Sequence, residues 1–244
     1  MTAERAPDAR FTGFADDQAR FFRALAKNQN RDWFLAHKHE YEQGWLEPMK
    51  ALLWDVRAKA VRTYGDEVLG VPKVFRIFRD VRFSRDKSPY KTHVAGYLPL
   101  AVTGGRVPGP VALYLHLGTD RYVGAGHWVM DAAQLARFRA ALLDDRRGAA
   151  LGRVLGKLEK AGFVVGSREA LKKLPRGVDP AHPRAELTKR KGLVVEFPPL
   201  PPKLIVSPAL VDWLAGRTAA AAPLVRWLAE HVGESGSRSP RRAG

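Results

Sequence analysis

The chain has 244 residues, 45% of them hydrophobic, and its 41 Lys and Arg side chains outnumber 25 Asp and Glu, a formal net charge of +16. This length is enough to bury a hydrophobic core without disulfides or a structural metal. The absence of cysteine excludes thiol nucleophiles, thiolate zinc sites, iron–sulfur clusters and disulfide frameworks. No run of 18 apolar residues is present and charges interrupt the first 25 residues, so we expect a soluble cytoplasmic protein without a membrane partner.

The positive charge is concentrated in two segments. Residues 1–72 are neutral overall, whereas residues 73–91 and 151–192 carry net charges of +5 and +7, which is +12 of the +16. A field concentrated in this way favours anionic partners. The alternative is a solvated basic surface that reflects a high arginine content.

The first third of the chain shows helical periodicity. Asp16 or Asp17 is expected to cap a helix with an apolar stripe over 21–25, and a short helix is expected over 33–41. Apolar residues then recur at spacings of three and four over 46–60, which predicts a longer amphipathic helix that a glycine ends.

From Lys73 the hydrophobic period changes to two, which predicts a strand over 73–83 with Phe75 and Phe83 in the core. Further strands are expected at 92–100, 111–118 and 121–129, with the turns of antiparallel hairpins. The remaining expected elements are helices at 131–142 and 149–161, a strand at 163–166, a short helix before Pro175, a strand at 193–197 and a last helix that starts at Ser207 and Pro208. The sequence therefore predicts an α+β fold with N-terminal helices, a central, largely antiparallel sheet and further helices on one face. We expect a single domain over 11–230 and a disordered basic tail at 233–244.

The segment from Lys73 to His93 is the strongest candidate for a functional site. The guanidinium fork of arginine and the mobile charge of lysine both suit phosphate or carboxylate groups. The residues expected to bind an anionic small molecule are Arg76, Arg79, Arg82, Ser84, Lys87 and Lys91, with a second wall from Lys172, His182 and Lys189. Arg79 falls on the apolar side of the predicted strand, so it needs a carboxylate or carbonyl partner.

Two carboxylates, Asp80 and Asp86, lie among these cations. Their first expected role is to orient the arginines and lysines, and metal binding or proton transfer are the alternatives. Whether the protein is an enzyme stays open; if it is, the groups available for proton transfer are Asp80, Asp86, Tyr90 and His93. Histidine spacing along the chain matches no metal motif, so we predict no metal site, and the sequence identifies no cofactor.

Two other interpretations of the same segment remain. Basic and aromatic residues interleave here, which also fits a non-specific nucleic-acid-binding module with Phe78 and Tyr90 as stacking groups. The third interpretation is a structural, salt-bridged hairpin without a ligand. Trp33 and Phe34 are expected to be core residues, and the sequence does not determine the oligomeric state.

The motif over 76–93, RIFRDVRFSRDKSPYKTH, closely resembles the signature of a mainly bacterial family, the domain-of-unknown-function family numbered 2461. Two further stretches, LAKNQNRDWFLAHKHEYE at 25–42 and LKKLPRGVDPAHPRAELTKRKGLVVEF at 171–197, resemble the family pattern as well. Gln29 departs from it, since the family usually has asparagine there, and Arg190 is an extra basic residue. The resemblance implies one domain over nearly the whole chain and no established activity. Its motifs coincide with the two basic segments, which favours an anion site over a merely solvated surface.

Overall fold

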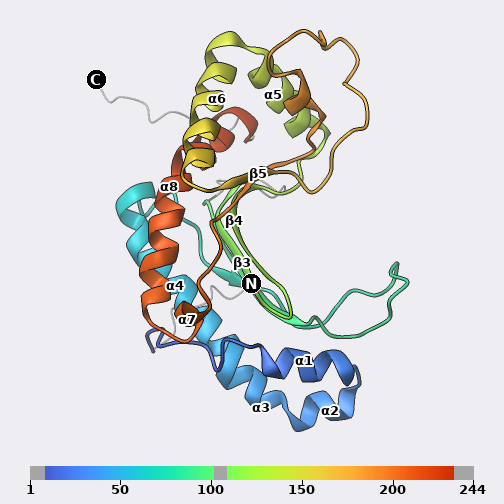
Figure 1. Ribbon diagram of the computed structural model, residues 1–244, viewed down its shortest axis with the longest axis vertical. Helices are drawn as coiled ribbons and strands as arrows, with labels where there is room; N and C mark the ends of the chain where they lie inside the picture. The colour runs from blue at the N-terminus through green and yellow to red at the C-terminus, as the bar shows by residue number, and fades with distance from the viewer. Residues whose placement is uncertain (1–8, 102–108, 234–244) are drawn as a thin grey trace. The chain divides into compact units, whose positions relative to one another are not determined.

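The computed structural model describes residues 9–101 and 109–233. Six strands form one antiparallel sheet in the order β1-β2-β3-β4-β6-β5, and helices precede and follow the strands along the chain (Figure 1). This confirms the predicted α+β fold with N-terminal helices. Residues 234–244 of the expected tail lie outside the described residues. Within the described ranges, no helix combines the length and the apolar character needed to cross a membrane.

The elements in chain order are α1 Arg20–Lys27, α2 Arg31–Ala36, α3 Lys38–Tyr41, a π-helical turn Glu42–Leu46, α4 Glu47–Tyr64, β1 Lys73–Val74, β2 His93–Pro99, β3 Val111–Gly118, β4 Arg121–His127, α5 Ala132–Leu143, α6 Asp145–Lys160, β5 Val164–Gly166, a 3₁₀ turn Ala185–Lys189, β6 Leu193–Glu196, α7 Pro202–Ile205 and α8 Ala209–Val232. The helix expected before Pro175 is not formed, because residues 171–175 are irregular. The described residues pack into two compact units, 9–99 with Leu113–Gly124 and Pro199–Ala219, and 100–101 and 109–112 with Ala125–Pro198 and 220–233.

Short polar side chains bind backbone N–H groups near the helix starts of the first unit. Asp16, one of the two predicted caps, accepts hydrogen bonds from the backbone N–H of Gln18 at 2.7 Å and of Arg20 at 3.2 Å. Asn30 caps α2 by accepting the N–H of Trp33 at 2.9 Å. The Asn30 contact satisfies an N–H that has no partner inside α2 and so favours the start of that helix. The predicted aspartate cap of α1 is not formed as such: Ala19 occupies the N-cap position without a side-chain cap, and Asp16 binds backbone N–H groups before and at the first helical residue.

The core of the first unit forms between α4 and the strands β1 and β2, which it contacts. Trp45, Met49 and Leu53 are buried there, and the Trp45 ring lies 5.4 Å from that of Phe14 and 4.9 Å from that of Phe22. The helix ends at Gly65, as predicted, where a φ of 90° suits a residue without a side chain.

The second unit contains α5 and α6 packed on each other and the antiparallel pair β5 and β6. Asp131 starts α5 through a reciprocal capping box with Gln134. Gly126 is required where β4 approaches β6, because its φ is 122° and an added Cβ would lie 2.4 Å from the carbonyl oxygen of Leu193.

Residues 75–83 do not form the predicted strand. β1 ends at Val74, and beyond it the backbone pairs only at intervals. The N–H of Arg79 donates to the oxygen of Pro89 at 2.9 Å, and the N–H of Lys91 donates to that of Ile77 at 2.8 Å. Residues 75–92 are therefore an irregular connection between β1 and β2, which we call the basic loop.

The two aromatic residues predicted for the core within this loop are exposed, Phe75 to 41% and Phe83 to 96%. Phe83 lies in a turn in which the N–H of Ser84 donates to the oxygen of Val81, and the turn carries its ring into solvent. Phe75 lies beside the ring of Tyr97, 5.2 Å away between centroids. The prediction was wrong because a period of two does not distinguish a strand from an extended loop that has few strand partners.

Candidate functional site: a basic loop and a histidine cluster

The basic loop is anchored to the N-terminal helices by Tyr90. Its ring is buried and stacks on that of Phe34 at 4.4 Å, while its N–H donates to Oε1 of Gln29 at 3.1 Å. Tyr90, proposed both as a proton-transfer group and as a stacking group, is thus part of the packing that holds the loop. Phe34 is in the core, as predicted.

Arg79 and Asp86 stabilise the loop from within. Arg79 forms an ion pair with Asp86 and donates a hydrogen bond to the oxygen of Ser88 at 3.2 Å, so it has both kinds of partner that the sequence requires. Asp86 also accepts the backbone N–H and the hydroxyl of Ser88, at 2.9 Å and 2.6 Å. These bonds, first those of Ser88 and then that of Arg79, lower the pKa of Asp86 to about 2.

Protonation of Asp86 is therefore expected to loosen the loop only in strong acid. Because its folded pKa lies below the usual 3.8, the carboxylate contributes stability above about pH 4 and loses that contribution as the pH falls towards 2. An NMR titration that follows the Ser88 amide is expected to show a midpoint near pH 2. In Asp86→Asn the transition is expected to be absent, and a midpoint at or above pH 3.8 contradicts the proposed contacts.

Other cations of the loop also have partners inside it. Asp80 accepts two hydrogen bonds from Arg82, at 3.0 Å from Nε and 2.7 Å from a terminal nitrogen, which lowers the pKa of Asp80. Lys87 donates to the carbonyl oxygen of Val81 at 3.0 Å. These side chains are exposed, so their pairing adds little to stability and leaves them less available to a ligand.

Arg76 and Lys91 differ from Arg79 and Arg82, which form ion pairs within the loop. Lys91 is half-buried, with Nζ 2.9 Å from the carbonyl oxygen of Arg76 and 5.2 Å from the ring centre of Phe75. Burial, and next the charge of Arg76, lower the pKa of Lys91. Neither cation has a carboxylate within 4.0 Å among the described residues. Two like charges are thus held near each other without an ion-pair partner within 4.0 Å among the described residues, and the Asp80 carboxylate acts on Arg76 only from a longer distance.

The second wall expected from the sequence belongs to the other compact unit. Lys189 forms an ion pair with Glu186 at 2.8 Å, and Nδ1 of His182 accepts the N–H of Arg184 at 3.2 Å. Lys172 is exposed in the irregular segment before Pro175. The part of these residues in a shared ligand site stays a prediction.

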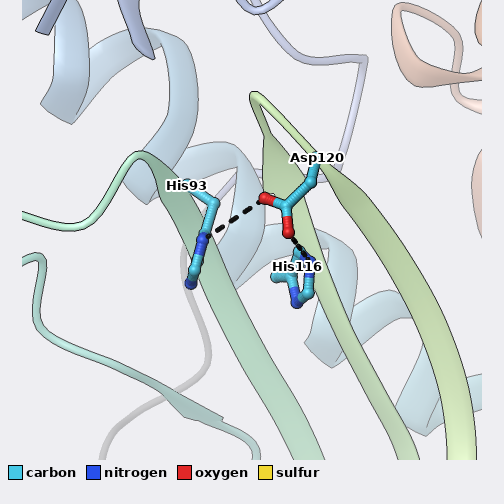
Figure 2. Close-up of side chains that lie close together, drawn as sticks. All are labelled: His93, His116 and Asp120. Carbon is cyan, nitrogen blue, oxygen red and sulfur yellow. Dashed lines mark ion pairs between the residues drawn. The ribbon is translucent and has the colours of Figure 1, made fainter. Parts of the chain in front are cut away.

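His93, the last of the proposed proton-transfer groups, lies in what we call the histidine cluster, with His116 and Asp120. Figure 2 shows the three side chains converging from the start of β2, from β3 and from the turn after β3. Asp120 lies 3.7 Å from Nδ1 of His93 and 3.2 Å from Nε2 of His116. The two imidazole rings stack with centroids 4.6 Å apart.

A close approach of two backbones builds this cluster. The N–H of Thr119 donates to the oxygen of Thr92 at 3.0 Å, and the hydroxyl of Thr119 donates to that of Thr92 at 3.1 Å. The two backbones can approach this closely only because residue 118 is a glycine. A Cβ added to Gly118 would lie 2.1 Å from the oxygen of Thr92 and 2.5 Å from Cα of His93. A glycine at this position therefore sets the separation of His93 and His116.

Both imidazoles of the cluster are neutral at neutral pH. Burial, followed by the neighbouring His116, lowers the pKa of His93 to about 4, although Asp120 opposes the shift. Burial also lowers the pKa of His116, again against the effect of Asp120. The carboxylate of Asp120 consequently lies beside two uncharged rings, each able to offer a nitrogen lone pair.

His116 and Asp120 were not among the predicted site residues, because the spacing of histidines near each other along the chain does not reveal partners on different strands. One signal was present: His116 and Tyr114 occupy alternate positions of a strand predicted with the right bounds, so they share a face. Which residue of β2 lies opposite His116 depends on strand register, which a long connection leaves undetermined.

The fold and these two groups define an α+β protein with an antiparallel sheet, a cationic loop and an adjacent cluster of two histidines and an aspartate. A family model described as a conserved hypothetical protein, DUF2461, matches residues 17–227. The chain belongs to this family. A search of curated proteins finds no match, and a search of solved structures finds none.

Proposed function

We propose that the protein binds an anionic small molecule, bearing phosphate or carboxylate, between Arg76 and Lys91. The observation that carries this proposal is that Arg76 and Lys91 lie close enough for the charge of Arg76 to lower the pKa of Lys91, while neither has a carboxylate within 4.0 Å among the described residues. An anion between them relieves their mutual repulsion and accepts hydrogen bonds from a guanidinium fork and an ammonium group. Two other arginines of the loop, Arg79 and Arg82, have internal carboxylate partners and support its shape, whereas Arg85 forms no ion pair among the described residues.

A charge-matched pair of variants tests this site. Arg76→Ala is expected to weaken the binding of pyrophosphate or citrate about 10- to 100-fold, because a hydrogen bond to a charged group contributes about 1.5–3 kcal/mol. Arg85→Ala removes the same charge from the same loop and is expected to change the affinity less than about twofold. Isothermal titration calorimetry at low salt measures both. Equal losses in the two variants would show a diffuse field in place of a site.

A second candidate function is favoured by the exposed aromatic rings of the loop. Phe83 is almost fully exposed and Phe78 is 51% exposed, and the guanidinium of Arg82 lies 5.9 Å from the ring centre of Phe83. Aromatic rings among cations are the arrangement on which single-stranded nucleic acid stacks. The stacking groups of this candidate are therefore Phe83 and Phe78, in place of Phe78 and the buried Tyr90.

Salt dependence distinguishes the two functions. Neutralising about four phosphates of a single strand gives a slope of about −3 for log affinity against log salt concentration. If the nucleic-acid function holds, the affinity for single-stranded oligonucleotides follows this slope, and Phe83→Ala lowers that affinity. If oligonucleotides do not bind at low salt, this candidate is eliminated and the small-molecule site remains. That the protein acts in the cytoplasm stays a prediction.

A further inference from the structure

We propose that His93, His116 and Asp120 bind a divalent first-row transition-metal ion of the zinc class. Imidazole nitrogen suits zinc, iron, nickel and copper, and a carboxylate adds the negative charge that such a site needs. This inference goes beyond anion binding by the basic loop and does not depend on it, since none of the three ligands belongs to that loop.

The spacing of the ligand atoms fits one ion. The three ligand atoms lie within 4.8 Å of one another, and Asp120 is 3.2 Å and 3.7 Å from the two imidazole nitrogens nearest to it. Zinc binds nitrogen and oxygen at about 2.0–2.2 Å, so two ligands of one tetrahedral ion are about 3.4 Å apart. The two Asp120 contacts are already close to that spacing, and a bound ion would draw any wider pair together through side-chain rotation.

His116 provides an independent observation. Its Nε2 atom is buried, and the polar group beside it is the Asp120 carboxylate at 3.2 Å, which acts on the His116 charge but does not meet the angles of a good hydrogen bond. A buried nitrogen left in this way requires an explanation, and an ion between Nε2 and the carboxylate is one. On the other side of the ring, Nδ1 lies 3.3 Å from the hydroxyl of Tyr114. When Nδ1 carries the proton and donates it to Tyr114, Nε2 presents its lone pair to the ion, as in many zinc sites.

Three protein ligands leave at least one coordination position for water or a substrate. Structural zinc sites are closed by four protein ligands, whereas catalytic sites keep such a position open. Asp120 is 67% exposed, so solvent reaches the ion from its side. Lys91 lies two residues before His93 in the chain, so a cation is close to one of the three ligands.

Calorimetric titration with Zn²⁺ and visible absorption with Co²⁺, in a buffer without phosphate, test the proposal on the full chain. We expect one ion per chain, with Co²⁺ bands typical of nitrogen and oxygen ligands. Removing a group that only hydrogen-bonds to a metal ligand lowers metal affinity about 10- to 100-fold. Asp120→Asn and His116→Gln each remove a proposed ligand itself, so both are expected to lower the zinc affinity by more than this. Mg²⁺ is not expected to compete, because it prefers oxygen ligands and retains water.

Matched controls separate ligation from a general loss of charge or fold. Asp66→Asn removes an acid with 71% exposure, and His39→Gln removes an exposed histidine outside the cluster; both are expected to bind zinc as the wild type does. Because Asp120 is exposed, its variant is expected to fold even if His116→Gln does not. The proposal is overturned if the wild-type protein binds neither ion, or if Asp120→Asn binds as tightly as Asp66→Asn.

Discussion

Gly118→Ala is expected to lower the free energy of unfolding by about 3 kcal/mol, near the upper end of the usual cost of overpacking. The new methyl group would lie 2.1 Å from the oxygen of Thr92 and 2.5 Å from both Cα and Cβ of His93. Most of these atoms belong to the backbone, so the conflict cannot be relieved by rotating a flexible side chain. The strands β2 and β3 must separate, which breaks the bond from Thr119 to Thr92 and moves His93 away from His116. Urea unfolding followed by circular dichroism measures the loss.

A second glycine of the same unit provides the control. Gly216 lies in α8, and an added Cβ there would meet nothing within 4 Å. Gly216→Ala is expected to stabilise the protein by about 0.5–1 kcal/mol, because alanine restricts the unfolded chain and favours a helix. If both variants change the stability by similar amounts in the same direction, the close approach at Gly118 is not what positions the cluster. The zinc affinity of Gly118→Ala is expected to fall with its stability.

Phe34→Ala is expected to lower the free energy of unfolding by about 3–5 kcal/mol, the range found when a buried phenylalanine is truncated. Phe34 is buried and contacts the rings of Tyr41, Phe78 and Tyr90. Its loss leaves a cavity at the point where the basic loop meets the N-terminal helices. We therefore expect faster hydrogen exchange at the Tyr90 amide and weaker anion binding by the loop, in addition to lower stability.

Leu35→Ala is the matched control for this change. Leu35 follows Phe34 in the same helix but is 54% exposed, so its truncation is expected to alter stability by no more than about 0.5 kcal/mol. Chemical denaturation and amide exchange of the two variants give the comparison. Equal effects of Phe34→Ala and Leu35→Ala would contradict the anchoring of the loop by the aromatic stack.

Among the predicted cations of the basic loop, the partner of Arg79 could be anticipated from the sequence, whereas the availability of Arg76 and Lys91 could not. The expectation that Arg79 needs a carboxylate or carbonyl partner came from the cost of burying a charge, and that cost is the same wherever the partner lies in the sequence. The availability of Arg76 and Lys91, by contrast, depends on which carboxylates the loop brings near them. Asp80 forms an ion pair with Arg82, and Asp86 forms one with Arg79. Which aspartate pairs with which arginine depends on the backbone path of the loop, which the sequence does not reveal.

By itself, the sequence determined the local elements, the family and the location of the charge. Helical and strand periods predicted α4, β3 and β4 closely, because each pattern reflects contacts that repeat within one element. Tertiary structure alone decided that Phe83 is exposed and that His93 lies beside His116 and Asp120. The exposure of Phe83 follows from the local turn at Val81 to Ser84, which replaces the predicted strand. The histidine cluster depends on strand register and on the close approach at Gly118, which arise from pairing between segments more than 20 residues apart along the chain.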